Sequence, residues 1–348
     1  MKVKHVCNIK IYKNLFPLRI FHAPSELLRG LTENQAKIVF EFNRKTENGF
    51  IELESVPCLC GYKRFDLIAS LDRYLMIQQT VICTNCGLIQ SNPRMTSEQY
   101  KDFYSSDVYR KCYSGEDFIS RYKSKYNSNE SLHIFDEINK IKTIDSDVSV
   151  LEFGAGGGRN LVPFIEAGAK VVGIDYSPNL VKLGREHGIN MMQGSIDEIV
   201  GIYDVIIMNH VLEHLLSPVE SLEKIKKHLK EDGIFYIAVP NIMNFSIGQL
   251  QNAHAYYFNP ETFQYYCFKA GLSMVKKGVS EGIHMFGIFK ALEVADENML
   301  IDDYLKNNYK KMLQHLRKIK IKEYAKLLLA VLHLKKITKA IYSRVFHA

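Results

Sequence analysis

The sequence predicts an α/β protein whose largest domain is a Rossmann-like, doubly wound sheet, and three observations carry this prediction. From about residue 146 to 293, short apolar runs alternate with amphipathic stretches, which is typical of βαβ units and a mostly parallel sheet. Glycine-rich residues 154–158 follow the first apolar run, and the acid Asp175 ends the second. Because the carboxyl ends of parallel strands meet at one edge of a sheet, the glycine loop and Asp175 are expected to face the same ligand.

Seven strands are predicted, five that alternate with helices and a final β pair. Gly168 and Gly188 are expected to end the first two helices, and Ser217 to begin a later helix through a capping box with Glu220. The predicted strands are 148–153, 171–174, 189–192, 203–208, 234–239, 273–279 and 284–292.

Other stretches flank this domain, which is placed at residues 146–293. Residues 1–55 form a lead-in with possible short strands at 9–12 and 50–53, and residues 56–92 contain four of the seven cysteines. Residues 93–145 are expected to form a mostly helical connector. Residues 294–348 form a basic helical tail.

The formal net charge of +7 is unevenly distributed along the chain. Residues 304–348 contain twelve Lys and Arg and one acid, so this stretch carries +11 and the rest of the chain carries −4. A mildly acidic body weakens a whole-protein argument for nucleic-acid binding. No apolar run approaches the roughly 18 residues of a membrane span, and residues 1–16 lack a signal-peptide core. A cytoplasmic protein with reduced cysteines is therefore expected.

The tail is predicted to be helical because apolar residues recur in it at helical spacing. A basic amphipathic helix can lie on an anionic membrane, bind an acidic partner or pack on its own protein. Peripheral contact with the inner membrane face, or with an acidic protein, therefore stays open. The apolar positions are Leu305, Tyr309, Met312, Leu316 and Ile319.

The glycine loop is expected to bind an adenosine-containing ligand. Glycines let the backbone turn tightly and approach a ligand, and the carboxylate of Asp175 can accept hydrogen bonds from both hydroxyls of a ribose. A dinucleotide fingerprint beginning at Gly154 would need a small residue at position 159, where the helix packs on the strand. Arg159 stands there, which argues against NAD and FAD.

The run from Glu152 to Gly158, with the pattern Glu-x-Gly-x-Gly-x-Gly, resembles motif I of the class I S-adenosylmethionine-dependent methyltransferases. The resemblance implies a seven-stranded methyltransferase sheet, S-adenosylmethionine as methyl donor and Asp175 as the ribose-binding acid. Residues 194–196 match the segment that contacts adenine, and residues 209–214 match the segment after the fourth strand. The donor-binding residues that it implies are Glu152, Gly154, Gly156, Gly158, Asp175, Ser195, Ile196 and Asn209.

The clustered cysteines form two pairs, Cys58-x-Cys60-Gly and Cys83-x-x-Cys86-Gly. A glycine after each pair permits a tight turn that points two thiolates at one metal ion. In a reducing compartment the pattern favours a four-thiolate zinc site, with a redox pair or unliganded thiols as the alternatives. Four thiolates leave no open coordination position, so a structural rather than a catalytic zinc ion is expected.

A second resemblance extends from the cysteine pairs towards the C-terminus. Residues 58–105 are similar to the zinc-binding domain that precedes the methyltransferase domain in a bacterial family. Residues 254–262, His-Ala-Tyr-Tyr-Phe-Asn-Pro-Glu-Thr, match a later segment of that family. The family includes sugar C-methyltransferases that act on nucleotide-linked deoxysugars. The resemblance spans about residues 56–292 and implies a nucleotide-linked sugar as methyl acceptor.

Candidate proton acceptors follow the predicted strands. His210 and His214 lie four residues apart, and His254 and Tyr257 lie in the later segment. His214 and His254 are the leading candidates for a general base, and a hydrogen-bonding role that holds its loop is an equal alternative for His214. The sequence Asn209-His-Val-Leu lacks the Asn-Pro-Pro-Tyr pattern of enzymes that methylate planar amino groups. Methylation of DNA bases is therefore disfavoured.

The sequence thus predicts an enzyme that transfers a methyl group from S-adenosylmethionine to a small polar acceptor. The preferred acceptor is a nucleotide-linked sugar methylated at carbon, in surface-polysaccharide or secondary-metabolite biosynthesis. One alternative is an O-methyltransferase of a lipid-like or phenolic acceptor. The other is a zinc-containing nucleic-acid-binding protein with a degenerate donor fold.

Overall fold

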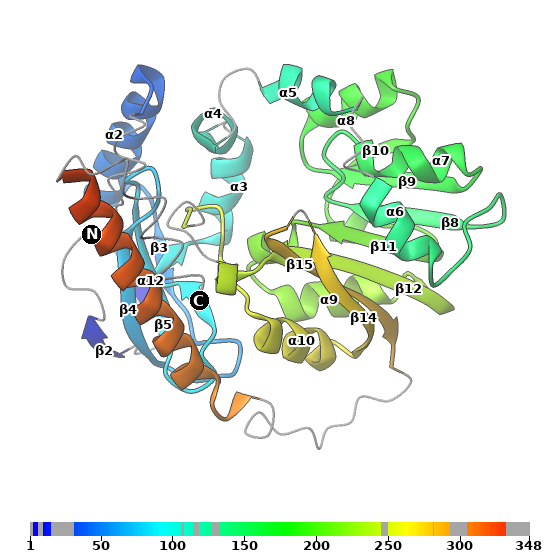
Figure 1. Cartoon of the computed structure of the whole chain (residues 1–348). Helices are drawn as coiled ribbons and strands as arrows, with labels where there is room; N and C mark the ends of the chain where they lie inside the picture. Colours follow the sequence, from blue (N-terminus) through cyan, green and yellow to red (C-terminus); the bar gives the residue numbers. More distant parts are fainter. Residues whose placement is uncertain are drawn as a thin grey trace. The chain divides into compact units, whose positions relative to one another are not determined.

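The computed structural model describes residues 3–5, 10–14, 31–105, 108–113, 118–126, 132–244, 250–280, 282–292 and 305–331. The chain divides into two compact units (Figure 1). Unit 1 comprises Met1–Phe103, Ile242–Tyr256 and Ile301–Ala348, and unit 2 comprises Tyr104–Asn241 and Tyr257–Leu300. Each unit therefore contains stretches that lie far apart in the sequence.

Unit 2 is built on a seven-stranded sheet with the order β10-β9-β8-β11-β12-β15-β14. The strands from β10 to β12 pair in parallel, and β15 pairs antiparallel with both β12 and β14. The order reverses between β8 and β11, which is where ligands bind in doubly wound sheets. The predicted fold class, with its final β pair, is confirmed. The strands are β8 (Ser149–Phe153), β9 (Lys170–Asp175), β10 (Met191–Gln193), β11 (Tyr203–Asn209), β12 (Leu229–Pro240), β14 (Leu272–Ser280) and β15 (His284–Ala291).

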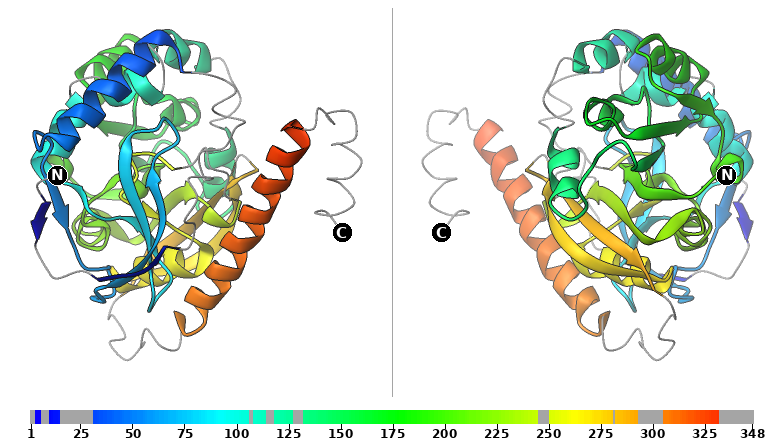
Figure 2. Two further views of the ribbon diagram at one scale, coloured as in Figure 1. Left: turned by 90° about the vertical axis from the view of Figure 1, so that its left-hand side faces the viewer. Right: turned by 90° about the vertical axis from the view of Figure 1, so that its right-hand side faces the viewer.

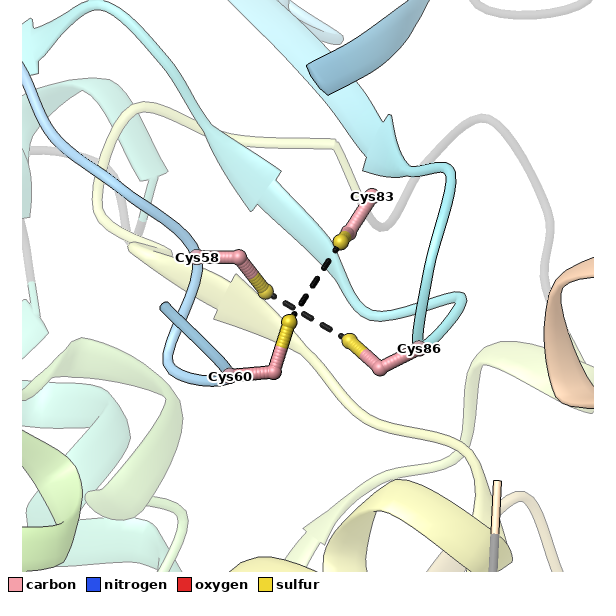
Figure 3. Close-up of side chains that lie close together, drawn as sticks. All are labelled: Cys58, Cys60, Cys83 and Cys86. Atoms are coloured by element: carbon pink, nitrogen blue, oxygen red, sulfur yellow. Dashed lines mark hydrogen bonds between the residues drawn. The ribbon is translucent and has the colours of Figure 1, made fainter. Parts of the chain in front are cut away.

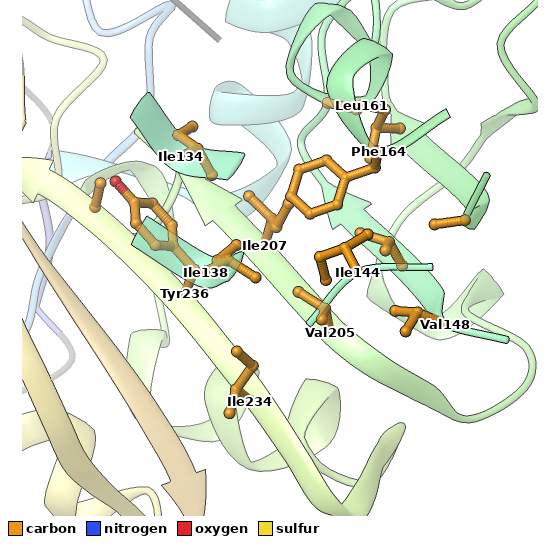
Figure 4. Packing of buried hydrophobic residues seen from close by; sticks show 14 of the residues in the cluster. Ile134, Ile138, Ile144, Val148, Leu161, Phe164, Val205, Ile207, Ile234 and Tyr236 are labelled. Atoms are coloured by element: carbon orange, nitrogen blue, oxygen red, sulfur yellow. The ribbon is translucent and has the colours of Figure 1, made fainter. Parts of the chain in front are cut away.

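Alternate strand residues of unit 2 point to opposite faces of the sheet, and helices cover both faces (Figure 1). Val205 and Ile207 of β11 face a core that also contains Ile138 and Phe164 from the covering helices (Figure 4). On the other face, Phe263 lies edge-on to Phe289. Helices α6 (Leu132–Asn139), α7 (Val162–Glu166) and α8 (Pro178–Glu186) contribute to the first core, and α9 (Pro218–Lys226) and α10 (Pro260–Lys269) are the later helices of the unit.

Two helix starts in unit 2 differ from the prediction. The helix expected over residues 160–167 is divided into the 3-10 turn η2 (Arg159–Leu161) and the short helix α7 (Val162–Glu166). Ser217 precedes α9 as expected, but its side chain makes no capping hydrogen bond, so the capping box with Glu220 was wrong. Pro218 at the first helical position has no N–H to be capped and already favours the helical φ, which lets α9 begin without a side-chain cap.

Unit 1 contains two small sheets. A five-stranded sheet has the order β13-β6-β5-β4-β2, and a three-stranded sheet has the order β1-β3-β7. The lead-in also forms a helix, α2 (Glu33–Glu47), where only short strands were expected. The strands are β1 (Val3–His5), β2 (Lys10–Asn14), β3 (Leu53–Ser55), β4 (Arg64–Leu71), β5 (Ile77–Cys83), β6 (Ile89–Ser91), β7 (Arg94–Met95) and β13 (Tyr256–Tyr257), in which Tyr256 is the last residue of the unit's middle stretch.

Three short helices follow β7 in the sequence before α6 begins. They are α3 (Ser97–Ser105), α4 (Val108–Tyr113) and α5 (Phe118–Lys125). Tyr104 near the end of α3, and the residues of α4 and α5, belong to unit 2. Side chains that come before β8 in the sequence therefore belong to the same unit as the glycine loop.

The described part of the basic tail contains one long helix in unit 1, α12 (Asn308–Val331) (Figures 1 and 2). Four of the five apolar positions that predicted it are buried, Leu305, Met312, Leu316 and Ile319. Of the three roles left open by the sequence, packing on its own protein is the one that the structure shows for these residues. Residues 332–348 lie outside the described part. Among the described helices, none is both long and apolar enough to pass through a lipid bilayer.

Candidate functional site

The glycine loop turns sharply at the carboxyl end of β8. Gly154, Gly156 and Gly158 all have φ between 58° and 79°, a region that residues with a Cβ rarely adopt. The amide of Gly154 donates to the carbonyl of Ile174 at 2.8 Å, which holds the loop against the end of β9. These glycines are therefore required by the backbone path as well as by close approach to a ligand.

Asp175 ends β9 beside this loop, as the sequence predicted. Its Oδ2 accepts from the amide of Gly156 and its Oδ1 from the amide of Ser177, each at 2.8 Å. Burial raises the pKa of Asp175, and the two amides and the guanidinium of Arg110 oppose that rise. The carboxylate is thus fixed in orientation by the backbone, with lone pairs remaining for further donors.

Glu152 lies under the glycine loop with 1% of its surface exposed. Its Oε1 accepts from the side-chain amide of Asn160 at 2.7 Å, whereas its Oε2 is buried and has no hydrogen-bond partner. Burial raises the pKa of Glu152 to about 8. A buried, unpartnered carboxyl oxygen is costly unless a ligand satisfies it, and a cationic ligand group would suit it well.

The remaining predicted donor residues occupy the ends of neighbouring strands. Asn209 is the last residue of β11, and Ser195 and Ile196 follow β10. Ser195 caps the 3-10 turn η3 (Ile196–Glu198) by accepting from the amide of Asp197, and its own amide donates to Glu198. The side chain of Ser195 therefore shapes this turn, and adenine contact stays a prediction for it and for Ile196.

Helices α4 and α5, and Tyr126 directly after α5, place side chains against the glycine loop that the sequence did not indicate. Arg110 lies 3.9 Å from Asp175, and the ring of Tyr122 lies 3.1 Å from where a Cβ on Gly156 would stand. The hydroxyl of Tyr126 donates to the carbonyl of Gly157. No local motif marks these residues, because they reach the loop through the packing of helices that come before β8 in the sequence.

His210 and His214 both border the carboxylate of Glu213. Glu213 Oε1 lies 3.6 Å from Nδ1 of His210 and 3.9 Å from Nε2 of His214, and Glu213 is 2% exposed. The two histidines do not share a helix, since His210 has a φ of 57° and is followed by the 3-10 turn η4 (Leu212–His214). Such backbone strain at a non-glycine residue often marks a functional site.

Two tyrosines, Tyr104 of α3 and Tyr109 of α4, contact His214. The hydroxyl of Tyr104 lies 2.7 Å from Nδ1 of His214, and the Tyr104 and Tyr109 rings each lie about edge-on to the imidazole. Tyr113 in turn contacts Tyr109. The tripeptide Phe-Tyr-Ser at 103–105 lies in the segment that carries the family resemblance. The resemblance did not predict that Tyr104 would contact His214, 110 residues later.

The other two predicted bases, Tyr257 and His254, are both buried. Tyr257 is a buried residue of unit 2. His254 belongs to unit 1, where it is 4% exposed and its Nε2 lies 2.5 Å from the side-chain nitrogen of Gln251. The hydroxyl of Ser91 donates to the main-chain carbonyl of His254 at 2.7 Å. Catalytic roles for both residues stay predictions.

The four predicted metal ligands converge in unit 1 (Figure 3). The sulfurs of Cys58 and Cys86 are 3.4 Å apart, those of Cys60 and Cys83 are 3.7 Å apart, and all four lie within 4.8 Å of one another. Four sulfurs at about 2.3 Å from a tetrahedral zinc ion would be separated by about 3.8 Å. The sequence prediction that the two pairs meet at one point is confirmed, and the donor set and spacing fit zinc.

The thiols in this cluster cannot all ionise independently. Burial raises the pKa of Cys58, whereas hydrogen bonding from Cys58 lowers the pKa of Cys60. A divalent cation would allow all four to be thiolates, because it replaces the shared protons. Zinc bound by these residues would link β5 and the turn after it to the segment before β4.

The start of α12 packs directly on the second cysteine turn. The side-chain amide of Asn308 donates to the carbonyl of Cys86 at 2.8 Å, and the hydroxyl of Tyr309 donates to Asp66 of β4. Gly87 has a φ of 74°, and a Cβ added to it would lie 2.8 Å from the backbone nitrogen of Tyr309. The helix and the cysteine turn therefore fit together only while position 87 is glycine.

Gly87→Ala and Gly61→Ala form a matched pair that tests this fit. Both glycines follow a cysteine pair with positive φ, but nothing lies within 4 Å of a Cβ added to Gly61. Gly61→Ala is expected to cost about 1–2 kcal/mol of unfolding free energy from backbone strain alone. Gly87→Ala is expected to cost about 1–3 kcal/mol more, since the helix backbone must move. Denaturant unfolding of both variants measures the difference, and equal losses would show that α12 is not held at Gly87.

Residues 126–277 match the family described as a methyltransferase domain. A ubiquinone biosynthesis O-methyltransferase of Rickettsia canadensis is 31% identical over 117 residues, which cover 30% of this chain and 50% of the relative. The C-methyltransferase NovU of Streptomyces niveus is 26% identical over 134 residues, which cover 35% of this chain and 32% of the relative. The chain thus spans half or less of the length of these curated relatives.

Solved structures of methyltransferases also resemble this chain. A 1,6-didemethyltoxoflavin-N1-methyltransferase of Burkholderia thailandensis has a TM-score of 0.46 and 18% sequence identity, with 62% of this chain and 96% of that chain covered. The family match coincides with the doubly wound sheet, the glycine loop and Asp175 of unit 2. Residues 126–277 therefore match a methyltransferase-domain family over the part of unit 2 that contains the glycine loop and Asp175.

Proposed function

We propose that this protein transfers a methyl group from S-adenosylmethionine to a nucleotide-linked sugar. The observation that carries the donor half is the paired environment of Glu152 and Asp175. Asp175 is oriented by two backbone amides beside the glycine loop, and Glu152 presents an unpartnered carboxyl oxygen beneath it. When bound, S-adenosylmethionine supplies an electrophilic methyl group. Asp175 would hold the ribose hydroxyls, and Glu152 would face positive charge on the donor.

The acceptor half of the proposal rests on three observations. The cysteine cluster has the geometry of a zinc module, the 254–262 segment is present, and NovU is among the similar proteins. A sugar without an acidic hydroxyl needs a base to remove a proton before or during transfer. His214 and His210, which border Glu213, and His254 and Tyr257 are the groups that we propose for this step.

The alternative acceptor is a phenolic or lipid-like hydroxyl. The ubiquinone biosynthesis O-methyltransferases among the similar proteins favour this alternative. The same donor site would serve both reactions, because the methyl group leaves the same sulfur whether the acceptor atom is carbon or oxygen. Mass spectrometry of nucleotide-linked deoxysugars and of polyprenylated phenols, each incubated with enzyme and labelled donor, separates the two. Label on a phenol but on none of the sugars would replace the sugar proposal.

Asp175→Ala is expected to weaken S-adenosylmethionine binding at least 100-fold. Hydrogen bonds to a charged group contribute about 1.5–3 kcal/mol each, and a ribose offers two hydroxyls. Isothermal titration calorimetry measures the effect. Asp197→Ala is the matched control, because Asp197 is an exposed acid near the same strand ends and pairs with Lys224. Donor affinity that is unchanged in Asp175→Ala, or undetectable in the unaltered protein, would contradict the donor site.

A further inference from the structure

Both ring nitrogens of His214 are turned towards protein groups. Nδ1 lies 2.7 Å from the hydroxyl of Tyr104, which is a short, well-formed hydrogen bond. Nε2 is directed to Glu213 Oε1 at 3.9 Å. At 3.9 Å the carboxylate is too far for a hydrogen bond but near enough to stabilise a protonated ring, and Nδ1 faces the Tyr104 hydroxyl. A proton that enters the His214 ring at Nδ1 therefore comes from the Tyr104 hydroxyl.

Tyr104 is the neighbour with the required chemistry. Its hydroxyl is hydrogen-bonded to Nδ1 of His214 and donates to it when that nitrogen carries no proton, and a phenol oxygen can accept a proton while it gives up its own. The arrangement of carboxylate, imidazole and hydroxyl follows the logic by which an adjacent base, oriented by a third group, activates an O–H group. Glu213 supplies the carboxylate, and its 2% exposure strengthens its interaction with a charged imidazole.

We propose that Tyr104 is the group that receives the acceptor's proton, as the outer member of a relay from Tyr104 through His214 to Glu213. This inference rests on the proposed function and deepens it. The acceptor's proton moves to the Tyr104 oxygen while the Tyr104 proton moves to Nδ1 of His214. The electron pair of the broken bond to hydrogen forms the bond to the methyl carbon, and the carbon–sulfur electron pair stays on sulfur. Glu213 then faces an imidazolium, which later releases its proton to water.

The surroundings of the relay support this direction of proton flow. His210 also borders Glu213 Oε1, and His284 lies edge-on to His210 with ring centroids 4.2 Å apart. Tyr109 covers the His214 ring from α4. The buried carboxylate of Glu213 favours a positive imidazole at His214.

The test compares Tyr104→Phe with Tyr113→Phe. Each variant removes one hydroxyl from the same cluster of aromatic side chains: the Tyr104 hydroxyl is hydrogen-bonded to His214, whereas the Tyr113 ring contacts Tyr109. Positioned acid–base groups contribute about 100- to 10,000-fold to a rate. We expect Tyr104→Phe to lower the single-turnover rate of methyl transfer at least 100-fold, with the Kd for S-adenosylmethionine within twofold of the unaltered protein. Tyr113→Phe is expected to keep the rate within twofold.

A second measurement needs no acceptor. Nitrogen-15 NMR of labelled histidine reports which nitrogen of His214 carries hydrogen, and we expect the neutral ring to be protonated at Nε2 and hydrogen-bonded at Nδ1. The Nδ1 signal should shift in Tyr104→Phe and stay in Tyr113→Phe. A neutral ring protonated at Nδ1, or a transfer rate in Tyr104→Phe above one third of normal, would overturn the relay. Neither result would contradict the proposed methyl transfer. The proposed function would be contradicted if the unaltered protein did not bind S-adenosylmethionine.

Discussion

Replacing Cys83 or Cys86 by Ser is expected to abolish zinc binding and to unfold the sheet of unit 1 that carries the cluster. Structural zinc contributes about 10–16 kcal/mol of apparent binding free energy in small zinc-finger peptides, as much as the whole stability of a typical domain. The sulfurs of the cluster lie within 4.8 Å of one another, so loss of one ligand leaves three thiols around a site that needs four. Elemental analysis should find about one zinc per chain before the substitution and almost none after it.

Cys267→Ser provides the control for this experiment. Cys267 is fully buried in α10 of unit 2 and is not part of the cluster, so its replacement should leave the zinc content unchanged. Hydrogen exchange of β4, β5 and α12 adds a structural readout, because Asn308 and Tyr309 join the helix to the cysteine turn and to β4. Zinc retained at full stoichiometry in both Cys83→Ser and Cys86→Ser would rule out the four-thiolate site.

Glu152→Gln is expected to stabilise the donor-free protein at alkaline pH while weakening donor binding. The pKa of Glu152 is raised by burial to about 8, so the folded state prefers the protonated carboxyl. Its stabilising contribution is complete below the unfolded pKa of 4.5 and is lost as pH rises through about 8. The loss reaches about 5 kcal/mol above that range. Gln has nearly the same shape as protonated Glu and stays neutral at every pH. Glu152→Gln therefore removes this contribution to the fall in unfolding free energy as pH rises.

The same substitution is expected to weaken the binding of S-adenosylmethionine. S-adenosylmethionine carries an ammonium and a sulfonium, and a neutral amide cannot compensate their charge, so Glu152→Gln should weaken binding at least tenfold. Denaturant unfolding at pH 5 and pH 8.5 measures stability, and calorimetry measures affinity. Glu166→Gln, at the exposed end of α7, is the control and should change neither. A pH dependence of stability that is identical in Glu152→Gln and the unaltered protein would contradict the assignment of the shifted pKa.

Parts of the fold and the site could be predicted because their signals are local. The strands of unit 2 were placed within a few residues, since buried strands read as short apolar runs that end at glycine or a polar residue. The lead-in helix α2 was missed, although Thr32 and Gln35 form a capping box and Val39 and Phe42 share a buried face. An apolar strand run is a strong signal by itself, whereas a capping box is not. Residues 1–55 show no sustained helical spacing of apolar residues that would have supported the capping box.

The sequence by itself determined the glycine loop, the position of Asp175 beside it and the convergence of two cysteine pairs. Each depends on residue types at the ends of neighbouring elements, and the turns and strands there leave few other arrangements. The tertiary structure alone decided that Tyr104 meets His214, 110 residues later, and that Asn308 meets Cys86, 222 residues earlier. Contacts of this kind follow from which buried faces pack together. That choice depends on the shapes of whole elements and leaves no periodic mark in the residues that finally touch.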